Sequence, residues 1–131
     1  HASTCTLVYF HRPRFSSGAD HGSAINLQPL WQVMYEAGVD VVLSAHDHLY
    51  ERFAPQDPDG KADPVRGIRQ FTVGTGGRSL YDIGEVQPNS EVINNRTFGV
   101  LKLTLGGGRY HWEFLPVEPA SFRDSGIGYC H

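Results

Sequence analysis

Two short apolar runs, separated by a stretch with helical periodicity, constrain the fold of this chain most strongly. Residues 4–10 (TCTLVYF) and residues 39–44 (VDVVLS) predict buried strands, and the mostly apolar content of the second is typical of parallel strands covered on both faces. The stretch between them begins near Asn26, a residue type that caps helices, and ends at Gly38. Its apolar residues repeat with the spacing of one helix face: Leu27, Leu30, Trp31, Met34 and Tyr35. This pattern predicts a βαβ unit whose parallel strands end at the same edge of a sheet.

The second half of the chain predicts antiparallel strands. Residues 68–73 (IRQFTV) predict a strand that runs into the glycines of residues 74–77, after a polar, turn-rich loop at residues 56–66. Residues 97–105 and 109–115 alternate between apolar and polar residues on either side of three glycines, which predicts a hairpin. Residues 78–95 have no regular pattern. The expected fold class is therefore α/β, a βαβ unit followed by antiparallel strands.

Size and charge narrow the classes of protein to consider. The 131 residues have the size of a single domain, residues 1–131. A net charge of -3 without a basic run argues against nucleic acid and anionic membranes as partners. No apolar stretch is long enough for a transmembrane helix or a signal peptide. Because the chain begins with His1 rather than methionine, we expect a processed product or a piece of a longer polypeptide.

The two cysteines lie close to the two ends of the chain. Cys5 and Cys130 are either two unrelated buried thiols or a disulfide that ties the C-terminal tail to the first strand. We favour the disulfide, because the termini of a domain often lie near each other. A disulfide would indicate an oxidising, extracytoplasmic compartment.

Three of the seven histidines stand where the first two strands end. His46 and His48 are spaced i, i+2, which on an extended segment projects both rings to the same side, with Asp47 pointing away. His11 ends the first strand, so parallel neighbouring strands would bring all three histidines to one edge. A single histidine at a strand end is usually structural, but three neutral imidazoles can hold a zinc ion.

Several segments together resemble the C-terminal half of the calcineurin-like metallophosphoesterases, in particular the purple acid phosphatase-like branch. They are residues 8–11 (VYFH), 11–15 (HRPRF), 45–48 (AHDH), 50–52 (YER), 71–77 (FTVGTGG) and the tail 124–131. The resemblance implies half of a four-layer αββα sandwich. The tail is similar to that of secreted bacterial members. The expected disulfide between Cys5 and Cys130 predicts a secreted or periplasmic protein.

The resemblance also implies a two-metal site that hydrolyses phosphate esters, with phosphomonoesters as the first expectation. His11 and His46 would bind one metal and His48 the other, the pair being drawn from iron, zinc and manganese. In such a site the metals clamp a phosphoryl oxygen and activate a bridging water. His21 would contact the phosphate or protonate the leaving group; the alternative for His21 is an exposed loop histidine.

The chain departs from the family pattern mainly by what it lacks. Ala45 replaces the usual glycine, and the aspartate and Asn-His motifs of the earlier half of the domain have no counterpart in residues 1–131. We therefore expect a partial domain whose remaining ligands come from a missing N-terminal half or from another chain. The alternative is a non-catalytic metal-binding or interaction module that retains the scaffold.

Neighbouring residues carry weaker expectations. Glu51 and Arg52 are predicted to form an ion pair that fixes the loop behind the histidines. Arg12 and Arg14 are either phosphate contacts or, by default, surface charges. The glycines of residues 74–77 either let the backbone approach the site closely or form an ordinary turn.

Overall fold

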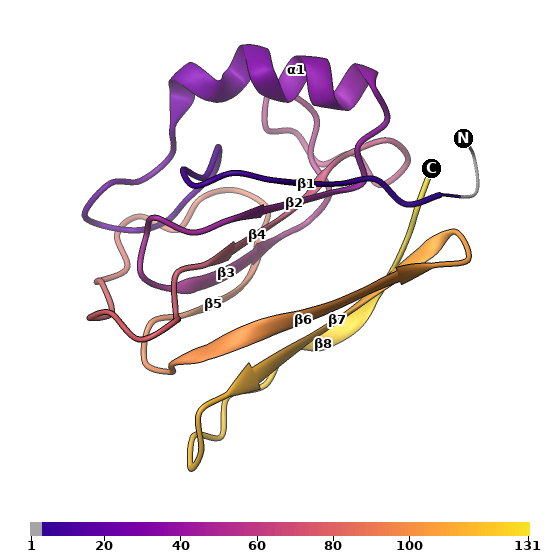
Figure 1. The fold of residues 1–131 in the computed structure, drawn as a ribbon. Coiled ribbons are helices and arrows are strands. Elements are labelled where there is room, and N and C mark those ends of the chain that lie inside the picture. The colour runs from indigo at the N-terminus through magenta and orange to yellow at the C-terminus, as the bar shows by residue number, and fades with distance from the viewer. Residues whose placement is uncertain (1–3) are drawn as a thin grey trace.

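The computed structural model describes residues 4–131 as three stacked layers (Figure 1). Helix α1 (Gln28–Glu36) covers one face of a five-stranded sheet, and a three-stranded sheet lies on its other face. The five-stranded sheet has the order β1-β2-β4-β3-β5, with bounds Leu7–Tyr9, Val41–Ser44, Arg69–Val73, Tyr50–Phe53 and Ser90–Asn94. The smaller sheet is antiparallel and consists of β6 (Gly99–Gly106), β7 (Arg109–Pro116) and β8 (Ser125–Tyr129).

The predicted βαβ unit is confirmed. Strand β1 pairs in parallel with β2, and β2 pairs in parallel with β4, so the carboxyl ends of all three lie at one edge. Strand β3 is antiparallel to both β4 and β5, and β6 and β7 form the expected hairpin. Gly107 and Gly108 in its turn both have positive φ, at 61° and 71°. The α/β fold class with an added antiparallel group is therefore correct.

Several strand predictions need correction. Strands β3 and β8 were not predicted, and β5 lies within residues 78–95, where no regular element was expected. The first strand is shorter than expected and is not fully buried, because β1 lies at a sheet edge and Tyr9 is 80% exposed. Edge strands have one neighbour, so a run of apolar residues there does not imply burial on both faces.

The helix forms where predicted, but its N-terminal cap differs from the predicted one. A short 3-10 turn, η1 (Ile25–Leu27), precedes α1, and Leu27 is the N-cap without a side-chain cap. The prediction that Asn26 caps the helix is therefore wrong. Gly38, with φ 73°, follows the helix as predicted, since a left-handed residue ends a helix at little cost when it is glycine. No helix within residues 4–131 has the length and apolar character needed to cross a membrane.

Two apolar cores and one disulfide hold the layers together. Trp31 and Met34 pack between α1 and the large sheet, whereas Phe71 and Trp112 pack between the two sheets. The predicted disulfide between Cys5 and Cys130 is present, with Cα atoms 5.3 Å apart. It joins the segment before β1 to the segment after β8, so the two ends of the chain are fixed to each other.

Candidate functional site

His11 and His46 meet at the carboxyl edge of the parallel strands. His11 follows β1 and His46 follows β2, and parallel pairing of these strands brings the histidines together. The Nδ1 atom of His46 lies 3.0 Å from Nε2 of His11, which is a hydrogen bond between two imidazoles. The convergence expected from strand adjacency is thus present for this pair.

The segment that carries His46 and His48 is tightly turned rather than extended. The Asp47 N–H donates to the Ala45 carbonyl and the Leu49 N–H to the Asp47 carbonyl, and His46 has a positive φ of 60°. The expectation of an extended segment is therefore wrong. The expectation for Asp47 holds, because Asp47 points inward, is fully buried and accepts a hydrogen bond from the Ser16 hydroxyl.

Among the described residues, His48 has no hydrogen bond or ring contact with His11 or His46, and a backbone carbonyl orients its ring. Its Nδ1 is 2.8 Å from the Ser79 carbonyl oxygen. A carbonyl only accepts hydrogen bonds, so Nδ1 carries a proton, and in the neutral ring this leaves the lone pair on Nε2. A histidine that donates one nitrogen to a carbonyl and offers the other to an electrophile is typical of metal ligands.

His21 and Tyr81 connect the two parts of the site. The ring of His21 lies 4.2 Å from that of His46 and 5.8 Å from that of Tyr81, between centroids. Tyr81 in turn stacks on His48 at 4.0 Å. Five rings therefore follow one another along the sheet edge. Sequence reasoning did not identify Tyr81, because it stands in a segment without a regular pattern.

The environment of His46 favours the neutral imidazole. Burial lowers the pKa of His46, and positive charge at His21, Arg12 and His11 lowers the pKa further, against the opposing effect of Asp47. Among the described residues, the buried Nε2 of His46 has no hydrogen-bond partner. A neutral ring with an unpaired nitrogen is the form that binds a metal ion.

These side chains fit only part of a dinuclear metal centre. Imidazole nitrogens suit iron and zinc, and His11, His46 and His48 supply them at one edge. Within residues 4–131, however, no group of three or more His, Cys, Asp or Glu side chains is placed to hold a metal ion. The carboxylate that would keep two cations close together is not among the described side chains of the site.

The buried carboxylate of Glu51 fixes the loop that leads to His21. Glu51 accepts hydrogen bonds from the N–H and the hydroxyl of Ser17, at 2.9 Å and 2.5 Å, and from the Ser90 hydroxyl at 2.6 Å. Burial raises the pKa of Glu51. The predicted Glu51–Arg52 ion pair is wrong, because consecutive strand residues point to opposite faces, and Arg52 pairs with Asp124 instead.

The two arginines near the site, Arg12 and Arg14, differ in their exposure to solvent. Arg12 is exposed and lines a cavity of about 270 Å³ together with His21 and His46. Arg14 is not the surface charge that we expected by default, since it is 9% exposed and its guanidinium lies over the ring of Phe15.

One of the glycines allows a close approach of two backbones. A Cβ at Gly74 would lie 2.0 Å from the carbonyl oxygen of Asp47, whereas a Cβ at Gly76 would meet nothing within 4 Å. The interpretation of close approach therefore holds for Gly74, at the end of β4, and not for Gly76.

The fold and the edge histidines together define a class of protein. The stack of a helix, a mixed sheet and an antiparallel sheet matches part of the calcineurin-like fold of purple acid phosphatases. No family model matches the chain. Among solved structures, purple acid phosphatase PPD1 from yellow lupin (Lupinus luteus) seeds matches 94% of this chain with a TM-score of 0.76 and 24% identity. GAP50, the anchor in the inner membrane complex of Plasmodium, matches 97% with a TM-score of 0.77 and 19% identity.

Proteins that are similar in sequence show to which family this chain belongs. Purple acid phosphatase 21 of Arabidopsis thaliana is 40% identical over 82% of this chain, and purple acid phosphatase 18 is 37% identical over 71%. A third relative from the same plant, named probable inactive purple acid phosphatase 1, is 31% identical over 74%. The chain belongs to the purple acid phosphatase family and matches a C-terminal portion of it.

The match covers only part of these proteins. The chain spans 26%, 22% and 16% of the length of purple acid phosphatases 21, 18 and 1, and 24% of the lupin chain.

Proposed function

We propose that residues 1–131 are part of a single metallophosphoesterase domain and supply its histidine ligands for the hydrolysis of phosphomonoesters, with diesters as second substrates. The observation that supports this most directly is the placement of His11 and His46 in contact at the edge where the parallel strands end. In this proposal His11 and His46 face one metal ion and His48 faces the other. The ions are drawn from iron, zinc and manganese.

The residues of the chain would orient the reacting groups. When bound, two metal ions lower the pKa of a water and stabilise the charge that develops on a phosphoryl group. His48 would hold its ion through Nε2, because the Ser79 carbonyl occupies Nδ1. His21, exposed and next to His46, would contact the phosphate or donate a proton to the leaving alkoxide.

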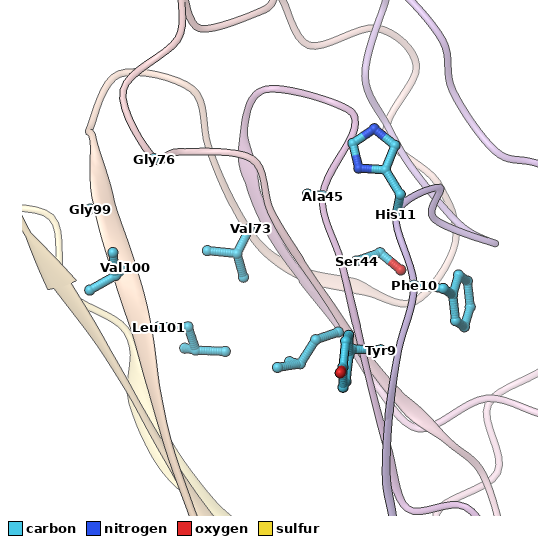
Figure 2. Close-up of a pocket in the computed structure, with 11 residues that line it drawn as sticks. Tyr9, Phe10, His11, Ser44, Ala45, Val73, Gly76, Gly99, Val100 and Leu101 are labelled. Carbon is cyan, nitrogen blue, oxygen red and sulfur yellow. The ribbon is translucent and has the colours of Figure 1, made fainter.

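The remaining ligands would come from the N-terminal portion of the same kind of polypeptide. Among the described residues, β1 and β6 each form the free edge of a sheet, and a cavity of about 590 Å³ lies between them. Figure 2 shows Val73 facing Val100 and Leu101 across this cavity, with His11 at one end. A strand added to β1 in parallel would end beside His11 and deliver its carboxylates there.

The disulfide supports a location outside the cytoplasm. A bond between Cys5 and Cys130 persists in oxidising compartments and is rare in the cytosol. We therefore propose a secreted or periplasmic protein.

The half-site is tested by comparing the chain alone with the complete polypeptide. Each is assayed on an aryl phosphate with zinc, manganese or iron. We expect turnover by the complete polypeptide and none by residues 1–131 alone, because three histidines do not replace the missing carboxylates. Robust metal-dependent turnover by the monomeric chain would contradict the half-site. Absence of turnover by the complete polypeptide would instead favour the non-catalytic module.

A further inference from the structure

The aromatic ring of Tyr81 contacts the rings of two histidines of the site, His48 and His21. It is half-buried and stacks on His48 with a centroid distance of 4.0 Å and an angle of 17° between the rings. It also stands edge-on to His21 at 5.8 Å and 64°. Contact with both rings suits a residue that fixes their positions.

Backbone hydrogen bonds hold Tyr81 against the segments that carry these histidines. The Tyr81 N–H donates to the His48 carbonyl at 2.9 Å, and the Asn95 side-chain amide donates to the Tyr81 carbonyl at 3.0 Å. One residue further on, the Asp82 carbonyl accepts from the Ala19 N–H at 2.9 Å, in the loop that leads to His21. These hydrogen bonds therefore fix the backbone from which the Tyr81 ring projects.

A second contact fixes the edge of the His48 ring. The Ser79 carbonyl accepts the proton on Nδ1 of His48, while Tyr81 covers one face of the same ring. A neutral imidazole in solution exchanges between two tautomers and rotates freely. The hydrogen bond selects one tautomer, and the stacked ring keeps the imidazole in the orientation that makes this hydrogen bond.

We propose that residues 79–81 form a clamp that positions His48, holding it in the tautomer with the lone pair on Nε2. Tyr81 is a positioning residue that acts through the face of His48. The purpose of the clamp rests on the proposed function, but the contacts themselves do not. A preoriented ring loses less conformational entropy when its ligand binds, and partners of ligating histidines typically contribute about 10- to 100-fold in metal affinity.

The aromatic ring of Tyr81, rather than its hydroxyl, orients His48. Within residues 4–131 no hydrogen-bond partner of the Tyr81 hydroxyl is found. The Tyr81→Phe variant keeps the stacked ring and serves as the matched control. Tyr81→Leu keeps apolar bulk without an aromatic face, and Tyr81→Ala removes both.

The deciding measurement is the tautomer of His48, without metal or substrate. Long-range proton–nitrogen NMR of the isotope-labelled protein at about pH 8, where free imidazoles are neutral, distinguishes Nδ1 from Nε2. We expect one tautomer, protonated on Nδ1, in wild type and Tyr81→Phe, and a mixture in Tyr81→Leu and Tyr81→Ala. His111, exposed on β7, is the internal reference and should not change.

Zinc affinity gives the second readout on the same variants. We expect the dissociation constant for zinc to rise about 10-fold or more in Tyr81→Leu and to stay at the wild-type value in Tyr81→Phe. If Tyr81→Leu folds and keeps both the wild-type tautomer and the wild-type zinc affinity, the clamp is refuted. An equal loss in Tyr81→Phe would also refute it, because the hydroxyl would then be responsible. None of these results depends on hydrolysis, so a failure of the proposed function is recognised separately.

Discussion

At the scale of single residues, Asp124 ties the tail of the chain to the large sheet. Its Oδ2 accepts hydrogen bonds from the Tyr50 hydroxyl at 2.6 Å, from Arg52 Nε at 2.8 Å and from Trp112 Nε1 at 3.1 Å. Burial by itself would raise the pKa of Asp124, but the hydrogen bonds from Arg52 and Tyr50 outweigh it and lower this pKa. The ionised carboxylate is therefore part of the folded structure.

Replacing Asp124 by Asn should destabilise the protein by about 2 kcal/mol, because Arg52 then loses the charge of its buried partner and keeps only its ion pair with the more exposed Glu91. Chemical unfolding in urea measures the loss. The matched control is Glu118→Gln, which removes the acidic member of the exposed Arg123–Glu118 pair and should cost less than about 1 kcal/mol. Equal losses in the two variants would contradict the assignment.

The lowered pKa of Asp124 also gives this contribution a pH dependence. A carboxyl group whose pKa is lower in the folded state stabilises fully above its unfolded pKa, about 4, and loses that effect as the pH falls through the folded pKa. The difference in unfolding free energy between wild type and Asp124→Asn should thus be constant near neutral pH and shrink below about pH 4. If the difference in unfolding free energy instead grows as the pH falls, the lowered pKa of Asp124 is contradicted.

At the scale of elements, the packing of the histidine loop on the end of β4 depends on one glycine. Gly74→Ala should cost about 2 kcal/mol or more, because the added Cβ would lie 2.0 Å from the Asp47 carbonyl oxygen and the loop must move. Gly76→Ala, two residues on and in open space, should change the free energy of unfolding by less than about 0.5 kcal/mol. Thermal unfolding of both variants tests the contrast, and comparable melting temperatures would rule it out.

Elements were predictable where residues near in sequence determine them. The apolar run of β2, the glycines that follow β4 and the glycine turn between β6 and β7 carry their own signals. Strand β3 does not, because its sequence YERF includes two charged residues whose partners lie far away in the chain. Arg52 finds Asp124, 72 residues further on, and Glu51 finds Ser17, 34 residues earlier.

At the scale of the whole molecule, the disulfide joins the two ends of a chain with a sequence separation of 125 residues. Replacing both Cys5 and Cys130 by Ser should destabilise the fold by about 4 kcal/mol, because the unfolded chain regains the entropy of a long open loop. Urea unfolding of wild type with and without reductant provides the comparison. If reductant shifts the wild-type midpoint as far as the double substitution does, the disulfide accounts for the loss; an unchanged midpoint would exclude it.

The candidate site was only partly predictable from the sequence, because several of its contacts join residues that lie far apart in the chain. Parallel strand adjacency was enough to bring His11 to His46. The placement of His48 depends on the Ser79 carbonyl and on Tyr81, in a loop whose path is fixed by contacts with Ala19 and Asn95. No local pattern in the sequence records such contacts.

The central claim is that these histidines form the ligand half of a phosphoesterase site. The most direct test measures bound metal and aryl phosphate hydrolysis in the complete polypeptide carrying His48→Ala, with His111→Ala as the matched control. We predict that His48→Ala lowers activity by at least about 100-fold and loses about one equivalent of metal, while His111→Ala keeps both. Full activity and full metal content in His48→Ala would contradict the account.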